Sequence, residues 1–524
     1  MRIISTIIIV LSFLFSNAQI TNSLEFNKAK RLMSLDSYQE ALPILKTLKE
    51  AYPNNYNLDF LIGECYLEQE YDKEQAIPFF EEASKHIGGD IYKNNFKNLF
   101  APIKVNYFLA KSYLLNYDLD KCIESATVLI ETTKDDNLLS ETKLIKKNAE
   151  TAKKLMQKPV DVKIHLMNIN SEFSDHSPLI NAEESQLIFT SRRKGSTGGL
   201  INDEGKYYED IYISYKKEGK WTEPINMGSN INTERHDAAV ALSADASSLI
   251  IYRDDFGVGN LYISVKDSMG WTKAVKLSSN INSNSNETYA AFSHDGQRLY
   301  FVSDIKDGFG QKDIYYSNKL PDGTWGFPQN IGSHINTEFD EDGVYIHPDG
   351  QKLYFSSKGH DNMGGFDFFY CDLIGDSAWS GPVNVGYPIN TTDNDLFAVF
   401  SADNRRAYYS ANKKEGKGSY DIYSIDLMSL PEKNNTIIKG YLRDSDNSII
   451  TNKLIKITDT EGLTVGKYRA NSKGLYTIVL KQDKTYNIQV KGLELENTKL
   501  IVPDKSAYFL TEEALIMKAI AKRE

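Results

Sequence analysis

The chain has 524 residues, 41% of them apolar, which is enough for several packed domains. Its formal net charge is −11 and Lys and Arg form no long cluster, which excludes nucleic acid as the main partner. Its cysteines, Cys65, Cys122 and Cys371, are odd in number and lack C-x-x-C spacing, which excludes a fully paired disulfide framework and disfavours metal ligation. We expect buried free thiols, and a Cys65–Cys122 bridge stays open as an alternative.

The first 18 residues have the pattern of a secretory signal peptide. Arg2 is a short positive region, Ile3 to Phe15 form an apolar run, and Ser16-Asn17-Ala18 ends it with small residues. A membrane anchor is the alternative, but this run is shorter than the roughly 20 residues that span a bilayer. The pattern predicts export and cleavage after Ala18. Gln19 follows in place of a cysteine, so no lipoprotein anchor is predicted.

Residues 20–158 have apolar side chains at helical spacing. One pattern occurs twice in this region: a large residue, then a small residue, then Tyr three positions later. The two copies are Ile62-Gly63…Tyr66 and Leu109-Ala110…Tyr113. This mark resembles the tetratricopeptide repeat, whose first helix needs a small residue where two helices cross. We predict three helical hairpins and a last helix at about 139–157. The array either binds a partner peptide or only packs as a structural arm.

Residues 160–430 contain a fivefold repeat. Its mark is Asp or Asn, then an apolar residue, then an aromatic one, at spacings of 50, 53, 54 and 54 residues. The five copies are Asp210-Ile211-Tyr212, Asn260-Leu261-Tyr262, Asp313-Ile314-Tyr315, Asp367-Phe368-Phe369 and Asp421-Ile422-Tyr423. In the third copy, alternating apolar runs flank the turn Asp295-Gly296, as in a β-hairpin. Four short strands per copy are typical of the blades of a β-propeller.

The blade count follows from how the ring closes. A Trp-containing outer strand follows the first four copies but not the fifth. The Ile-Asn mark that ends each outer strand also occurs once before the first copy, at Ile169-Asn170. We therefore predict that residues 161–168 supply the outer strand of the last blade. This arrangement gives five blades rather than six and removes an exposed sheet edge.

Residues 436–503 alternate like the strands of a small antiparallel β-sandwich. The positions of Gly440, Asp444, Asp459, Gly462 and Gly474-x-Tyr476 resemble the carboxypeptidase regulatory-like domain. The resemblance implies a non-catalytic spacer. Residues 504–524 are predicted to be a C-terminal tail, either a short helix or an extended polar end.

No catalytic, cofactor-binding or metal-binding residue is predicted. Carboxylates such as those of Asp340, Glu341 and Asp342 can serve in acid–base chemistry or bind Ca²⁺, but their recurrence from blade to blade favours a structural role. The long insertion from Arg192 to Asp210 is the better candidate, because insertions in a repeat scaffold tend to lie on the functional face. The predicted partner-binding residues are Arg192, Arg193, Lys194, Tyr207, Tyr208, Asp340, Glu341 and Asp342.

The order of these parts resembles the OmpA-family periplasmic proteins of Bacteroidota, with the layout of their PorE-like members. The propeller marks of that family, of the TolB-like type, are carried here by Ser293-His294-Asp295-Gly296, Leu299-Tyr300-Phe301 and Asp313-Ile314-Tyr315. The family's C-terminal OmpA-like domain has no counterpart up to Glu524, so direct peptidoglycan binding is not expected.

The resemblance implies a periplasmic, non-enzymatic scaffold or adaptor. Its partners would be proteins of an outer-membrane-associated complex, linked to type IX secretion or gliding. The alternative hypothesis is a propeller that binds or hydrolyses a glycan or a small molecule. Substituting Asp340, Glu341 and Asp342 together distinguishes the two, because only the alternative predicts loss of an activity.

Overall fold

The computed structural model describes residues 22–69, 72–88, 95–202, 205–375, 378–413, 415–428, 434–502, 510–512 and 515–516. The chain divides into two compact units, one of Met1–Lys158 with Thr391–Asp393, the other of Pro159–Asn390 with Asn394–Glu524. The predicted signal segment, residues 1–18, lies outside the described residues. Within them, no helix is long and apolar enough to cross a membrane.

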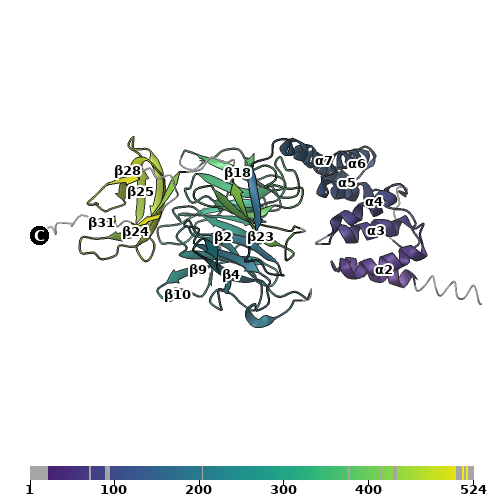
Figure 1. Ribbon diagram of the computed structural model, residues 1–524, viewed down its shortest axis with the longest axis horizontal. Coiled ribbons are helices and arrows are strands. Elements are labelled where there is room, and N and C mark those ends of the chain that lie inside the picture. The colour runs from purple at the N-terminus through teal and green to yellow at the C-terminus, as the bar shows by residue number, and fades with distance from the viewer. Residues whose placement is uncertain are drawn as a thin grey trace, which may run out of the picture. The chain divides into compact units, whose positions relative to one another are not determined.

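The first unit is helical, as the periodicity predicted (Figure 1). Its elements are a helix over residues 22–33, α2 (Tyr38–Ala51), α3 (Tyr56–Leu67), η1 (Lys73–Gln75), α4 (Ala76–Ser84), α5 (Val105–Leu115), α6 (Leu119–Thr132) and α7 (Asp136–Met156). From α2 onward each α-helix packs against the next. A Cβ on Gly63 would lie 2.5 Å from the Phe80 ring, so the crossing of α3 and α4 requires a residue without a side chain.

All three cysteines are buried free thiols. Burial raises the pKa of Cys65, Cys122 and Cys371 to about 12 in each case. Such thiols are packing residues, and the Cys65–Cys122 bridge does not form.

In the second unit, the described residues between Val162 and Leu427 form five antiparallel sheets (Figure 1). The first two are β2 (Asp175–Ile180), β3 (Gln186–Ser191), β4 (Asp210–Lys217), β5 (Lys220–Trp221) and β6 (Ile225–Asn226), then β7 (Asp237–Leu242), β8 (Ser248–Asp254), β9 (Gly259–Asp267), β10 (Gly270–Trp271) and β11 (Val275–Lys276). The third is β12 (Glu287–Phe292), β13 (Arg298–Ser303), β14 (Asp313–Asn318) and β15 (Gln329–Asn330). The fourth is β16 (Glu341–Ile346), β17 (Lys352–Ser357), β18 (Asp367–Ile374), β19 (Ala378–Trp379) and β20 (Val383–Asn384), and the fifth is β21 (Leu396–Phe400), β22 (Arg406–Ala411), β23 (Asp421–Leu427) and β1 (Val162–Leu166).

The first long strand of each sheet contacts that of the next, in the order β2, β7, β12, β16 and β21, and β21 contacts β2. The sheets therefore form a closed ring. These inner strands line a cavity of only about 30 Å³ at the centre, walled by apolar side chains such as Leu179, Val240, Ala290, Val344 and Val399. A space of this size holds about one water molecule.

The ring is closed by a strand from the other end of the chain. β1 pairs antiparallel with β23, from Val162 opposite Leu427 to Leu166 opposite Tyr423. The predicted pairing of residues 161–168 with the last sheet is confirmed. The Asn170 side chain also donates to the Ile422 carbonyl at 2.8 Å and accepts from the Ile422 N–H at 2.9 Å.

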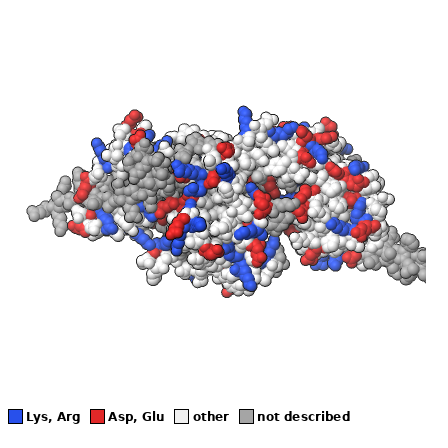
Figure 2. All heavy atoms as spheres, viewed as in Figure 1, with Lys and Arg blue, Asp and Glu red and all other residues white. Residues whose placement is uncertain are grey.

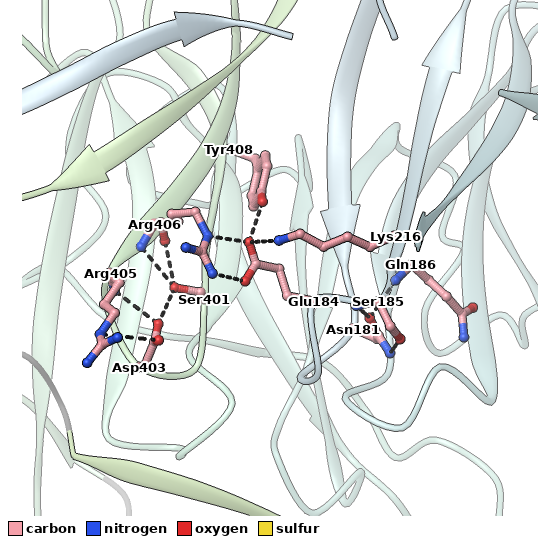
Figure 3. A network of polar contacts seen from close by, with 10 residues as sticks. All are labelled: Asn181, Glu184, Ser185, Gln186, Lys216, Ser401, Asp403, Arg405, Arg406 and Tyr408. Carbon is pink, nitrogen blue, oxygen red and sulfur yellow. Dashed lines mark hydrogen bonds and ion pairs between the residues drawn. The ribbon is translucent and has the colours of Figure 1, made fainter. Parts of the chain in front are cut away.

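A buried ion network joins the first and last sheets (Figure 3). Glu184, in the turn after β2, accepts hydrogen bonds from Arg406 at 2.6 and 2.5 Å, from Lys216 at 3.1 Å and from the Tyr408 hydroxyl. Burial alone would raise the pKa of Glu184, but its bonds from Arg406, with the charges of Arg406 and Lys216, outweigh burial and lower that pKa. Charge pairing therefore closes the ring together with strand pairing.

The last part of the chain forms two further sheets. One contains β24 (Asn435–Arg443), β27 (Leu475–Lys481), β30 (Leu510–Glu512) and β31 (Leu515–Ile516), and the other β25 (Leu454–Thr458), β26 (Thr464–Arg469), β28 (Lys484–Val490) and β29 (Lys499–Val502). Both sheets contribute to one apolar core. The predicted tail differs from the structure, because β30 and β31 pair in parallel with β24 and extend this region beyond residue 503.

Candidate functional site

The loops between the second and third strands leave every sheet at the same end of the ring, because the sheets repeat one strand order. On the first two sheets these loops, or the strand residue directly after them, also contact the segments that lead into the next inner strand. A Cβ on Gly198 would lie 2.9 Å from Glu234 Cγ, and the Gly259 N–H donates to the Asn286 side chain at 3.0 Å. We call residues 192–202, 205–209, 227–236, 254–258, 277–286 and 304–312 the loop face.

The repeated Ile-Asn mark has a structural role beneath this face. In each copy the Asn side chain accepts the N–H and donates to the C=O of the residue that follows the repeated Asp or Asn. The pairs are Asn232 with Ile211, Asn282 with Leu261, Asn336 with Ile314 and Asn390 with Phe368. These buried amides fix each loop segment to its sheet and leave no free group for a ligand.

The acids that open the inner strands are also held internally, by two kinds of partner. Asp175 and Asp237 each bind an arginine, Arg193 at 2.6 Å and Arg253 at 2.5 Å. The longer Glu287 and Glu341 instead accept a hydrogen bond from a short serine, Ser303 at 2.9 Å and Ser357 at 2.7 Å. In all four cases the partner lies on the next strand of the same sheet or just after it, as expected of a structural pair.

Burial changes the titration of these acids. It raises the pKa of Glu287, and it raises that of Glu341 to about 7 although Ser357 and Thr337 hydrogen-bond its carboxylate. A carboxyl group with such a pKa can act in acid–base catalysis when substrate reaches it. Glu341, however, is fully buried.

The predicted residues of the fourth sheet lie around this glutamate. Asp340 pairs with Lys358 at 2.8 Å, and Asp342 pairs with Lys312 at 3.1 Å. The side chain of Asp340 is partly exposed, whereas that of Asp342 is buried. The remaining predicted residues all belong to the insertion on the first sheet, so the prediction covers two separate places.

Within the insertion, a cluster around Glu209 anchors the loop. The Glu209 carboxylate lies 3.0 Å from Arg192 Nη2, 3.4 Å from His176 Nε2 and 3.1 Å from His236 Nδ1. Burial raises the pKa of Glu209, but hydrogen bonds from both histidines and the charge of Arg192 hold it well below the ordinary 4.5. The Tyr208 ring meets the His236 ring edge-on at 4.7 Å.

The other insertion residues divide between internal contacts and solvent. Arg193 is turned inward onto Asp175 and over the Phe189 ring, and Tyr207 packs edge-on against Phe173 at 5.7 Å. Lys194 is exposed. Of the predicted residues on this loop, Lys194 offers the most open side chain, while Arg192 and Arg193 hold the loop in place.

Exposed apolar side chains, which the sequence reasoning did not single out, lie on the same face. Leu200 is 49%, Ile201 56%, Phe256 90% and Phe309 51% exposed. They come from the loops of the first, second and third sheets. The Arg235 guanidinium lies 5.2 Å from the centre of the Phe256 ring. Phe256 and Phe309 both stand four residues before the repeated Asn or Asp, and this shared position is the sequence signal that could have identified them.

Metal binding has no structural support in the described part of the chain, where no group of three or more His, Cys, Asp or Glu side chains could hold an ion. In the Glu209 cluster, Arg192 and the two histidines all contact the Glu209 carboxylate. Figure 2 shows acidic and basic side chains interspersed over the visible surface, without a large patch of one sign.

No protein-family model matches the chain, and no curated protein matches it. Solved structures do. TolB from Acinetobacter baumannii is 12% identical with a TM-score of 0.31, over 57% of this chain and 72% of that one. A putative TolB from Agrobacterium tumefaciens is 16% identical with a TM-score of 0.27, over 52% and 99%. A thermostable family-43 glycoside hydrolase is 13% identical with a TM-score of 0.34, over 50% and 92%. Because these identities and TM-scores are low, the solved structures carry no argument about this chain. The description of the ring therefore rests on the strand pairing described above.

Proposed function

We propose that this chain is a non-enzymatic protein-interaction module of the cell envelope. In this interpretation the ring is a five-bladed, TolB-like β-propeller, the helices are tetratricopeptide-like repeats and the last two sheets form a regulatory-like β-sandwich. The single observation that carries the proposal is the group of exposed apolar side chains on three neighbouring loops, Leu200, Ile201, Phe256 and Phe309. Large apolar side chains that are exposed on one face of a folded protein commonly mark an interaction site.

The surrounding polar groups support the same conclusion. The acids beneath the loop face are already engaged by arginine or serine, and Glu209 is engaged by two histidines and an arginine. These polar contacts hold the loops in position. A rigid apolar surface binds a partner with a smaller loss of conformational entropy than a mobile one. The exposed Phe256, with Arg235 beside it, has the chemistry of an interface anchor.

The location and partners follow from the family resemblance. We propose that the chain is exported by a cleaved signal peptide to the periplasm and joins an outer-membrane-associated complex. The order of the modules suggests that this complex serves type IX secretion or gliding. The helical region is a second candidate binding module of the same scaffold.

Affinity purification from cross-linked native envelopes tests the proposal. The chain is expected to recover a stoichiometric protein partner, and the variant Leu200→Ser/Phe256→Ser/Phe309→Ser to lose it. The matched control is Phe327→Ser, because Phe327 is 82% exposed but lies outside the loop face. Recovery of no partner, or equal loss in both variants, contradicts the proposal.

Glycan binding or hydrolysis is the competing function, and the raised pKa of Glu341 is the observation in its favour. It predicts that substituting Asp340, Glu341 and Asp342 abolishes a measurable activity while the fold is retained. Under the interaction proposal these substitutions alter stability alone.

A further inference from the structure

A second feature lies at the other end of the ring, where the hairpin turns of the second and third sheets face the C-terminal sheets within the same compact unit. A cleft of about 460 Å³ opens there. Its ring side includes the turns at residues 243–248 and 293–296, and its other side includes Asn452, Arg469, Asn471 and Thr477. Small-molecule sites commonly have volumes of about 300–1,000 Å³.

The two sides of the cleft are joined by specific hydrogen bonds. The Lys467 N–H donates to His294 Nε2 at 3.2 Å, and the Asn471 side chain donates to Asp245 at 2.8 Å. Arg469 Nη2 donates to the Gln297 side chain at 2.8 Å. Desolvation of the imidazole lowers the pKa of His294, and its Nε2 accepts the Lys467 N–H, so His294 adds no positive charge at neutral pH.

Two cations of the cleft have no carboxylate partner among the described residues. Arg469 donates only to neutral oxygens, of Asn452 and Gln297, and its Nε has no hydrogen-bond partner. Lys319 lies at the rim with its Nζ 5.5 Å from the centre of the Trp325 ring. Burial and the charge of Arg469 both lower the pKa of Lys319, so the two cations already repel each other.

The acids that also line the cleft, Asp245 and Asp295, form no ion pair with Lys319 or Arg469 among the described residues. Asp295 accepts from Ser293 and from the Gln297 N–H within its own turn. Asp245 accepts from Ser243, Ser247 and Asn471. Most of the remaining polar lining consists of hydroxyl groups, including that of Thr477, which is buried without a hydrogen-bond partner.

From these contacts we infer that the cleft binds a small, hydroxyl-rich anion, with its carboxylate or phosphate between Lys319 and Arg469. The unpaired positive charge supplies the attraction for the anion, and the Ser, Thr and Asn side chains supply partners for its hydroxyl groups. Such a ligand would contact both sides and stabilise the packing of the C-terminal sheets on the ring. This site is independent of the loop face.

Isothermal titration of the full chain at constant ionic strength tests the inference with three probes. Glucuronate and inorganic phosphate present the two anionic groups, and glucose resembles glucuronate without its carboxylate. Saturable binding of at least one anion, with a dissociation constant of about 1 mM or tighter, and none of glucose, is expected. Which anion binds more tightly distinguishes the carboxylate from the phosphate source.

The variant Lys319→Gln removes a rim charge that makes no structural contact beyond the Trp325 ring, and should weaken anion binding at least about tenfold. Lys220→Gln, an exposed lysine on β5 of the same unit, is the matched control and should leave binding unchanged. Equal weakening in the two variants, equal binding of glucose, or no saturable binding of either anion overturns the inference.

Discussion

At the scale of single residues, Glu209 and Glu341 show that different partners shift the pKa of the same type of side chain in opposite directions. Glu341 is buried with neutral partners, and its pKa rises to about 7. Glu209 is half-buried beside His176, His236 and Arg192, and its pKa falls well below 4.5. The two glutamates should therefore affect the pH dependence of stability in opposite directions.

The substitution Glu341→Gln tests the first of these effects. The folded-state pKa exceeds the unfolded value, so the folded state binds the proton more tightly and loses stability as pH rises from about 4.5 to 7. An uncharged glutamine avoids this loss and keeps acceptor and donor atoms for Thr337 and Ser357. We expect a gain of roughly 1–3 kcal/mol in the free energy of unfolding at pH 8 and little gain at pH 4, measured by urea denaturation.

The control for this substitution is Glu338→Gln, three residues earlier and exposed. It should leave the pH profile of the parent unchanged. If Glu341→Gln also leaves that profile unchanged, the Glu341 carboxyl group is not protonated in the folded protein at neutral pH.

Glu209→Gln should give the opposite sign. A lowered folded-state pKa contributes stability above the unfolded pKa, and this contribution is lost as pH falls through the folded value. The variant should be less stable at pH 7 by roughly 2–4 kcal/mol, because the half-buried Arg192 and both histidines lose the carboxylate that they contact. Denaturation at pH 7 and pH 3 checks this, since the difference from the parent should shrink at pH 3. A constant difference would contradict the assignment.

At the scale of elements, β1 shows why the closure of the ring was predictable. The Ile169-Asn170 mark before the first copy matches the Ile-Asn marks that follow the other outer strands. The Asn170 side chain makes the same pair of hydrogen bonds as the other repeated asparagines, here with the backbone of Ile422. The strands β30 and β31 were not predicted, because their parallel pairing with β24 depends on tertiary contact rather than on local alternation.

Paired substitutions in β1 test its role. Ile164 and Leu166 pack against the core of the last sheet, whereas Lys163 and His165 face solvent. Replacing Ile164 and Leu166 by serine should lower the free energy of unfolding by roughly 1 kcal/mol for each half-buried side chain. Replacing Lys163 and His165 by serine should change it by less than about 0.5 kcal/mol. Equal effects in a thermal or urea unfolding experiment would mean that β1 does not seal the last sheet.

The loops were predicted less well than the strands, for a physical reason. Strands repeat because ladder hydrogen bonds and core contacts constrain every copy, so their marks are visible in one sequence. Exposed loop residues such as Phe256 and Phe309 are not constrained by core packing, and their shared position before the repeated Asn or Asp occurs in only two copies, so it is a weak signal. The insertion itself was recognised, but the charged residues chosen on it, Arg192 and Arg193, turned out to be largely engaged within the chain.

At the scale of the whole molecule, the two ends of the ring differ in character. The loop face carries exposed apolar side chains above saturated polar pairs. The opposite end carries a cleft with unpaired cations against the C-terminal sheets. Under the two proposals, the loop face binds a protein and the cleft at the opposite end binds a small anion.

The most direct test of the central claim is site-specific photo-cross-linking in the native envelope. A photoreactive phenylalanine analogue is placed at Phe256 or Phe309 on the loop face, and at Phe327 as the exposed control. The account predicts a discrete cross-linked protein partner from Phe256 and Phe309 and none from Phe327. The absence of cross-links at both loop positions, or the same products from all three, would contradict the assignment of the loop face as the interaction surface.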